Sequence, residues 1–185
     1  MTERPRRFSL AKFKRFRRAD SGVAAIEFAM VGLPFLWLLC ATFETGLVLI
    51  AEYTIENGTQ QAGRMIRTGQ VQTQGLTQAK FKDIVCSGLA TTMLDCKNNL
   101  YVDVRSFPSF SAVSLPPPVV NGQLSPAATT NSSYQPGTPL QVVVVRTYYN
   151  WKLFTPGISK LANLGSTSRL LASSTSFRNE PYAIQ

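Results

Sequence analysis

Histidine is absent from the 185 residues of the sequence, and acidic residues are few, 10 against 19 basic ones. Without histidine the chain cannot form a His-dependent catalytic triad, a histidine general base or a histidine-bearing metal site. Neither a P-loop nor a GxGxxG motif after a strand is present. The acidic residues after position 70 are widely spaced and form no convincing acid/base pair: Asp83, Asp95, Asp103 and Glu180. We therefore expect no enzyme, with no catalytic residue, no metal and no cofactor.

Charge is nearly absent from one long stretch, residues 21–51. The sixteen residues Phe28 to Phe43 carry no charge, and only Glu27 and Glu44 interrupt the wider run. A hydrocarbon core about 30 Å thick needs roughly 20 helical residues at about 1.5 Å each, which 24–43 supplies. A buried core helix is usually shorter and amphipathic, whereas this run is apolar all round. The stretch therefore predicts one membrane-spanning helix, with Glu44 hydrated at its outer boundary.

The net charge of +9 is concentrated before this run. Residues 1–22 hold eight basic and two acidic residues, a net charge of +6, and the remaining chain holds 11 basic and 8 acidic residues, a net charge of +3. Basic residues beside a membrane span stay on the cytoplasmic side, so we expect the N-terminus inside and the chain after about Ala51 outside. A basic arm can also bind nucleic acid. Its position against the span favours a role in topology, and we expect no nucleic-acid partner.

A glycine and a glutamate lie at the cytoplasmic edge of the span. Gly22 precedes the apolar residues, Glu27 follows five positions later and Phe28 comes next. An ordinary secretory signal has a shorter apolar core and a small-residue cleavage site after it, which is not found near Ala51. A leader cut after Gly22 would instead leave Val23 as the new N-terminus, with the helix still in the bilayer.

Placing Glu27 in the membrane is unfavourable, because a carboxylate near the centre of the hydrocarbon raises the free energy of insertion by about 2.5–3.5 kcal/mol. Such a group usually has a partner or a function. The new amine at Val23 would lie about one helical turn from Glu27, so the two charges of neighbouring subunits could offset each other's desolvation. The alternative is that Glu27, close to the boundary, reaches headgroup water.

This Gly-x-x-x-x-Glu-Phe arrangement resembles the type IV prepilin processing motif. The segment SGVAAIEFAMVGLPFLWLL (21–39) is similar to the start of TadE/TadF-like proteins, the pseudopilins of Flp (Tad, type IVc) pilus assembly. The segments AEYTIENGTQQAGRMIRTGQ (51–70) and SFRNEPY (176–182) also resemble this family. The resemblance covers the leader, the helix, the region of the two later cysteines and the last strand, and is weak over 108–139.

The resemblance implies a minor pseudopilin or assembly component. A prepilin peptidase would cleave after Gly22, and Glu27 would be the assembly contact. Its other partners would be further pseudopilins, the major Flp pilin, inner-membrane assembly platform proteins and the lipid bilayer. The protein would cross the bacterial inner membrane once, with a periplasmic C-terminal domain, and would either stay there or enter a pilus.

The pattern after the span predicts an α+β protein. Apolar residues at helical spacing continue the helix as a stem to Gly69, so that 1–22 is the leader, 23–69 the span and stem, and 70–185 a small head. A helix is expected at 77–90 and another at 154–164. Strands are expected at 100–107, 140–149 and 168–178, giving an antiparallel sheet of about three or four strands packed on helices; the four valines 142–145 indicate burial on both faces.

Of the three cysteines, Cys86 and Cys96 lie ten positions apart in the head. On the outer side of a bacterial-type membrane such a pair favours a disulfide. Metal binding is the alternative, but two thiols without a histidine make a poor site.

Residues 108–139 are rich in Pro, Ser, Thr and Asn. So long a loop is unusual in a small domain, and we expect a solvated excursion rather than a partner surface. Two other functions fit the same pattern. The first is an uncleaved bitopic scaffold protein of the same secretion system, and the second is a membrane-tethered periplasmic binding module whose long loop grips a ligand.

Overall fold

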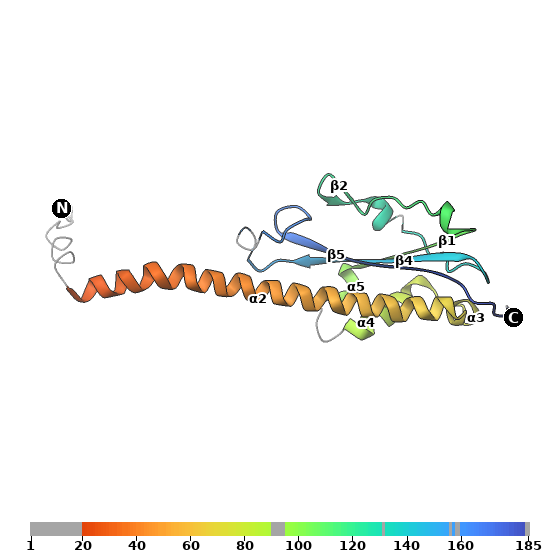
Figure 1. Ribbon diagram of the computed structural model, residues 1–185, viewed down its shortest axis with the longest axis horizontal. Helices are drawn as coiled ribbons and strands as arrows, with labels where there is room; N and C mark the ends of the chain where they lie inside the picture. The colour runs from red at the N-terminus through yellow and green to blue at the C-terminus, as the bar shows by residue number, and fades with distance from the viewer. Residues whose placement is uncertain (1–19, 90–94, 131, 156, 158–159, 184–185) are drawn as a thin grey trace, which may run out of the picture. The chain divides into compact units, whose positions relative to one another are not determined.

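The computed structural model describes residues 20–89, 95–130, 132–155, 157 and 160–183. The chain divides into two compact units, Met1–Ala41 and Thr42–Gln185. One helix, α2 (Asp20–Arg67), contributes to both. Figure 1 shows it in red to yellow, and the sheet strands in green to blue.

The described part of the first unit is the apolar beginning of α2. Its side chains are exposed almost throughout, for example Phe28 at 79 % and Met30 at 74 %. By length and composition α2 is the one helix of the described residues that could cross a membrane. An apolar surface of this size is not stable in water, so the helix fits a single-pass membrane protein.

In the second unit α2 becomes amphipathic. Its buried residues recur at helical spacing along one side, and Val48, Ile55 and Ile66 are each at most 2 % exposed. Leu49 and Tyr53, on the other side, are 60 % and 68 % exposed. This change of pattern lets one continuous helix meet an apolar environment first and a protein core afterwards.

The sheet of the second unit has three antiparallel strands in the order β1 (Leu100–Phe107), β4 (Val142–Lys152), β5 (Ser168–Arg178). Between α2 and the sheet the described residues form the helices α3 (Gln70–Thr73), α4 (Gln78–Leu89) and α5 (Cys96–Asn99). The central strand aligns Val145 with Val104 on β1 and with Thr175 on β5. The expected α+β fold with a small antiparallel sheet is thus confirmed.

Both faces of the central strand are buried, as its run of valines predicted. Val143, Val145 and Tyr149 belong to the main core, which α2 and α4 complete with Ile55 and Phe81. Tyr148, whose side chain points to the opposite face of β4, belongs to a second, smaller core with Ala128, Leu164 and Leu170. The sheet therefore separates two apolar layers.

The long loop 108–139 supplies part of the second layer. It contains the short helices η1 (Phe110–Ala112) and η2 (Pro126–Ala128) and the two-residue strands β2 (Val119–Val120) and β3 (Gln123–Leu124). Ala128 is 2 % exposed. The expectation of a solvated excursion is wrong for this part of the loop, because it covers one face of the sheet.

The disulfide between Cys86 and Cys96 is present, with 5.8 Å between the two Cα atoms, and joins α4 to the start of α5. The second expected helix, 154–164, is not formed by the described residues of that segment; positions 156, 158 and 159 lie outside the described residues. Asn163 and Leu164 instead bond through their N–H groups to the carbonyl of Ser168, which turns the chain into β5.

Candidate functional site

The leader-cleavage motif lies in the first turns of α2. The helix begins at Asp20, so Gly22, Val23, Glu27 and Phe28 are all helical. Val23 is 52 % exposed and Phe28 is 79 % exposed. Because residues four apart share one face of a helix, Val23 and Glu27 lie one above the other. The motif is therefore presented on an open helical surface.

Among the described residues of this unit, none requires position 22 to be glycine. A Cβ built on it would meet nothing within 4 Å, and its φ is not positive. In a helix interior glycine is less stable than alanine by roughly 0.5–1 kcal/mol. Gly63 is different, because a Cβ there would stand 2.8 Å from Cγ2 of Thr175 and 3.1 Å from Cε1 of Phe177.

Glu27 is exposed and forms no ion pair with any residue that the structure describes. Its carboxylate lies on the part of α2 whose side chains are turned outward. Within the described residues, no group of three His, Cys, Asp or Glu residues could hold a metal ion.

Glu44 differs from the expectation of a hydrated boundary residue. It is 3 % exposed and lies inside the second unit. Its carboxylate accepts hydrogen bonds from the backbone N–H groups of Phe154 and Thr155 and from the hydroxyl of Thr155. Glu44 thus fixes the chain that leaves β4 against the helix. The sequence signal was only a charge at the end of an apolar run, and the partner lies 110 positions away.

A buried ion pair, not anticipated from the sequence, joins two strands. Nη2 of Arg146 on β4 lies 2.5 Å from Oδ2 of Asp103 on β1, and Nε of Arg105 lies 3.0 Å from Oδ1. The same groups hold the long loop, since Nη1 of Arg146 donates to the carbonyl of Pro116 (2.9 Å) and the N–H of Ser133 donates to Asp103 (2.8 Å). The loop is bound by charge-assisted hydrogen bonds, which are about twice as strong as neutral ones.

The environment of this pair is apolar as well as charged. The guanidinium of Arg146 lies 5.6 Å from the ring centre of Tyr148, and the Tyr148 side chain is almost fully buried. Burial raises the pKa of Tyr148 to about 12, against the weaker opposing effect of Arg146. These features are those of a structural clamp for the loop.

The model of the family described as TadE-like protein matches residues 22–64. No curated protein and no solved structure gives a match. The matched segment begins at Gly22, contains Glu27 and Phe28, and continues along α2 into the second unit. It supports a pseudopilin-type component associated with the Tad pilus. Residues 22–64 of the chain are thus a TadE-like domain.

Proposed function

We propose that the protein is a minor pseudopilin or assembly component of an Flp (Tad, type IVc) pilus. In this proposal a prepilin peptidase removes the leader 1–22, and the mature chain assembles through its N-terminal helix. The TadE-like match, which starts at Gly22, carries the proposal. In the same proposal the N-terminus stays in the cytoplasm, as expected of a basic leader, α2 crosses the bacterial inner membrane and the second unit lies in the periplasm.

Three observations support a processed and assembled chain. Gly22 is open to its surroundings and is not required by packing. Glu27 lies on an outward face where a neighbour's new N-terminal amine can reach it. The apolar side chains around it are exposed, so that lipid or other helices must cover them. Assembly beside other pseudopilins and the major Flp pilin, on the inner-membrane platform proteins, meets all three requirements.

The first test is the N-terminus of the mature protein. In cells that have their prepilin peptidase we expect a chain beginning at Val23, and Gly22→Leu should leave the full-length chain. Gly46→Leu is the matched control, because Gly46 is also helical and a Cβ there would meet nothing within 4 Å. N-terminal sequencing and intact mass distinguish the forms. A wild-type chain still beginning at Met1 contradicts processing and favours the uncleaved scaffold.

The second test concerns the assembly contact. Glu27→Gln removes the charge that would pair with a neighbour's amine, so the variant should be cleaved but recovered at least tenfold less with the major Flp pilin under mild detergent. The control is Glu56→Gln, a change at an exposed position of α2 outside the apolar run. Equal recovery of Glu27→Gln and the wild type would contradict the contact. A tethered binding module should be unaffected by replacement of either Gly22 or Glu27.

A further inference from the structure

Strand β5 forms an edge of the sheet, because among the described residues β4 is its only strand neighbour in the order β1-β4-β5. The directions of the backbone N–H and C=O groups on β5 can be worked out from β1, the strand at the opposite edge of the sheet. On β1, the N–H of Val104 donates to the carbonyl of Ser133 and its carbonyl accepts from the N–H of Gln135. Val104 therefore bonds away from β4. Since hydrogen bonding alternates along antiparallel ladders, its partner Val145 bonds towards β5.

The same alternation continues onto β5. Thr175 lies opposite Val145 and is held by the ladder, so Ser174 and Ser176 direct their N–H and C=O groups outward. Leu170 lies an even number of positions before Ser174, so its N–H should also point outward. It does, because this N–H donates to Oδ1 of Asn163 at 2.6 Å. Beyond Leu170 the described part of the chain offers no such partner to Ala172, Ser174 or Ser176. These three residues leave a row of open donors and acceptors.

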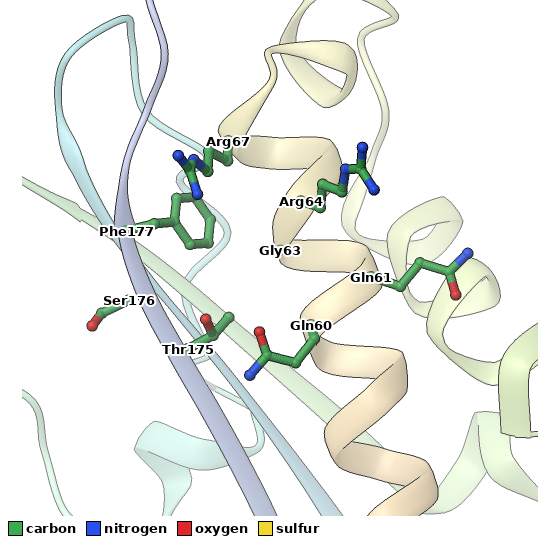
Figure 2. A pocket seen from close by; sticks show the side chains of 8 residues that line it. All are labelled: Gln60, Gln61, Gly63, Arg64, Arg67, Thr175, Ser176 and Phe177. Atoms are coloured by element: carbon green, nitrogen blue, oxygen red, sulfur yellow. The ribbon is translucent and has the colours of Figure 1, made fainter.

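A groove of about 580 Å³ runs beside this open edge (Figure 2). Gly63 brings α2 close to β5, so that Thr175 and Phe177 point into the space between them. The lining comes from α2 and β5 alone: Gln60, Gln61, Gly63, Arg64, Arg67, Thr175, Ser176 and Phe177. The groove thus has an unpaired strand on one side and a polar helix on the other.

The lining is cationic. It contains Arg64 and Arg67 and no carboxylate. Arg67 pairs with Glu180 at 3.2 Å, and both side chains are about half exposed. Arg64 is exposed and has no ion pair with a described residue. An occupant with carboxylates on the side facing α2 would match this charge.

We propose that β5 is extended by an added strand from another protein of the pilus assembly, an extended segment whose side chains towards α2 include Asp or Glu. Main-chain hydrogen bonds to Ala172, Ser174 and Ser176 give the binding, and Arg64 selects the partner by charge. The inference rests on the proposed function for the identity of the assembly. The open edge of β5 and the groove beside it are then the surface through which the second unit binds its partners.

A second copy of this chain fits the edge poorly. Helix α2 and β5 run in the same direction, since Glu52 pairs with Arg169 near the start of β5 and Arg67 with Glu180 just beyond its end. Antiparallel pairing of two β5 strands would therefore set the Thr42–Arg67 parts of the two α2 helices in opposite directions, so that the two chains would leave the same bilayer at opposite ends of the pair. Parallel pairing would set the two copies of Arg178 side by side, and like charges there are unfavourable.

The test is photo-crosslinking from the full chain in its native membrane. A photoreactive benzoylphenylalanine replaces Ser176, and the crosslinked peptide is identified by mass spectrometry. We expect a peptide of another Tad pilus protein with Asp or Glu beside the crosslink. A crosslink to a second copy, to lipid or to nucleic acid would overturn the proposal, as would the absence of any crosslink.

Two pairs of variants make the test specific. Ser174→Pro removes an outward N–H but no ladder bond, which an edge strand tolerates, whereas Ser174→Ala keeps that N–H. Arg64→Glu reverses the charge in the groove, whereas Lys80→Glu makes the same change on the exposed surface of α4. The crosslink should fall at least tenfold in Ser174→Pro and in Arg64→Glu and stay unchanged in the two controls. Persistence in both test variants contradicts the added strand.

The N-terminus is sequenced in the same samples. A chain that begins at Val23 but gives no crosslink ends this inference and leaves the proposed function standing. A chain that begins at Met1 contradicts the proposed processing, whatever the crosslink shows.

Discussion

Glu44 illustrates how one carboxylate connects the apolar part of α2 to the protein core. It is the first charge after sixteen uncharged residues, and it is buried. A buried carboxylate is tolerated only when its oxygens are hydrogen-bonded, and here the backbone of Phe154 and Thr155 provides the donors. Glu44 therefore lies where α2 begins to be covered by the rest of the second unit.

Glu44→Ala should lower the free energy of unfolding of the second unit by about 2–3 kcal/mol, because it leaves the donors of Phe154 and Thr155 unpaired. Glu44→Gln keeps one acceptor oxygen and should cost about 1 kcal/mol. Chemical denaturation measures both, and amide exchange should quicken first at Phe154 and Thr155. Glu56→Ala, on the exposed side of α2, should stay within about 0.5 kcal/mol. A Glu44→Ala variant as stable as that control contradicts the anchoring role.

Tyr148 gives a prediction about alkaline pH. Its ring is buried, and its hydroxyl finds no partner among the described residues. Burial raises the pKa of Tyr148 to about 12, whereas an unfolded tyrosine titrates near 10. The folded state thus disfavours the phenolate, so this contribution to stability is fully present below pH 10 and is lost as the pH rises from 10 through 12.

Tyr148→Phe should reduce the loss of stability between pH 10 and pH 12. At pH 7 it should change the free energy of unfolding by less than about 1 kcal/mol, because the hydroxyl that it deletes is unpaired among the described residues. Urea unfolding at pH 7, 10, 11 and 12 measures both effects. Tyr134, whose pKa burial also raises to about 12, should keep some pH dependence in the variant. If the free energy of unfolding fell equally steeply with pH in the wild type and in Tyr148→Phe, Tyr148 would not be the group responsible for the alkaline loss of stability.

At the scale of elements, the fit between α2 and β5 depends on Gly63. Alanine is favoured over glycine in a helix by roughly 1 kcal/mol, but its Cβ would stand 2.8 Å from Cγ2 of Thr175. Overpacking of this kind costs about 1–3 kcal/mol, so it should outweigh the gain in helix propensity. The close approach is therefore a requirement of packing.

Gly63→Ala should lower the free energy of unfolding by about 1 kcal/mol. In a Thr175→Ser background the same change should be neutral or stabilising, because the methyl group that the new Cβ meets is gone. The double-mutant cycle is measured by chemical denaturation, and its interaction energy should reach about 0.5 kcal/mol or more. If the two substitutions changed the free energy of unfolding additively, a clash with the methyl group of Thr175 would not be the reason that position 63 requires glycine.

The same scale shows which elements could be predicted. The four valines of β4 indicated burial on both faces, and the two cysteines indicated a disulfide, because both signals are local in the sequence. The covering by loop 108–139 was missed since its composition is polar and its clamp joins Asp103 to Arg146, 43 positions away. Predicting that β5 lies at the edge also requires the order of the strands in the sheet, and no local sequence pattern reveals that order.

For the whole molecule, the sequence signals at Gly22 and Glu27 indicated a resemblance to TadE-like proteins, and the model of that family matches residues 22–64. What they could not indicate is where the buried side of α2 begins. The apolar run continues to Ala51, whereas the second compact unit begins at Thr42. The difference arises because Glu44 and Val48 are buried by residues far along the chain.

A truncation experiment tests this division. The fragment 42–185, exported to an oxidising compartment, should fold as a detergent-free protein with the Cys86–Cys96 disulfide, because the main core lies wholly within it. The fragment 52–185 lacks Val48 and Ala51 from that core and the Glu44 anchor, so its unfolding free energy should be lower by at least about 3 kcal/mol. Differential scanning calorimetry and urea unfolding compare the two fragments. If the shorter fragment is as stable as the longer one, the part of α2 between Thr42 and Ala51 belongs to the membrane anchor, and the second unit begins later than the contacts of Glu44 require.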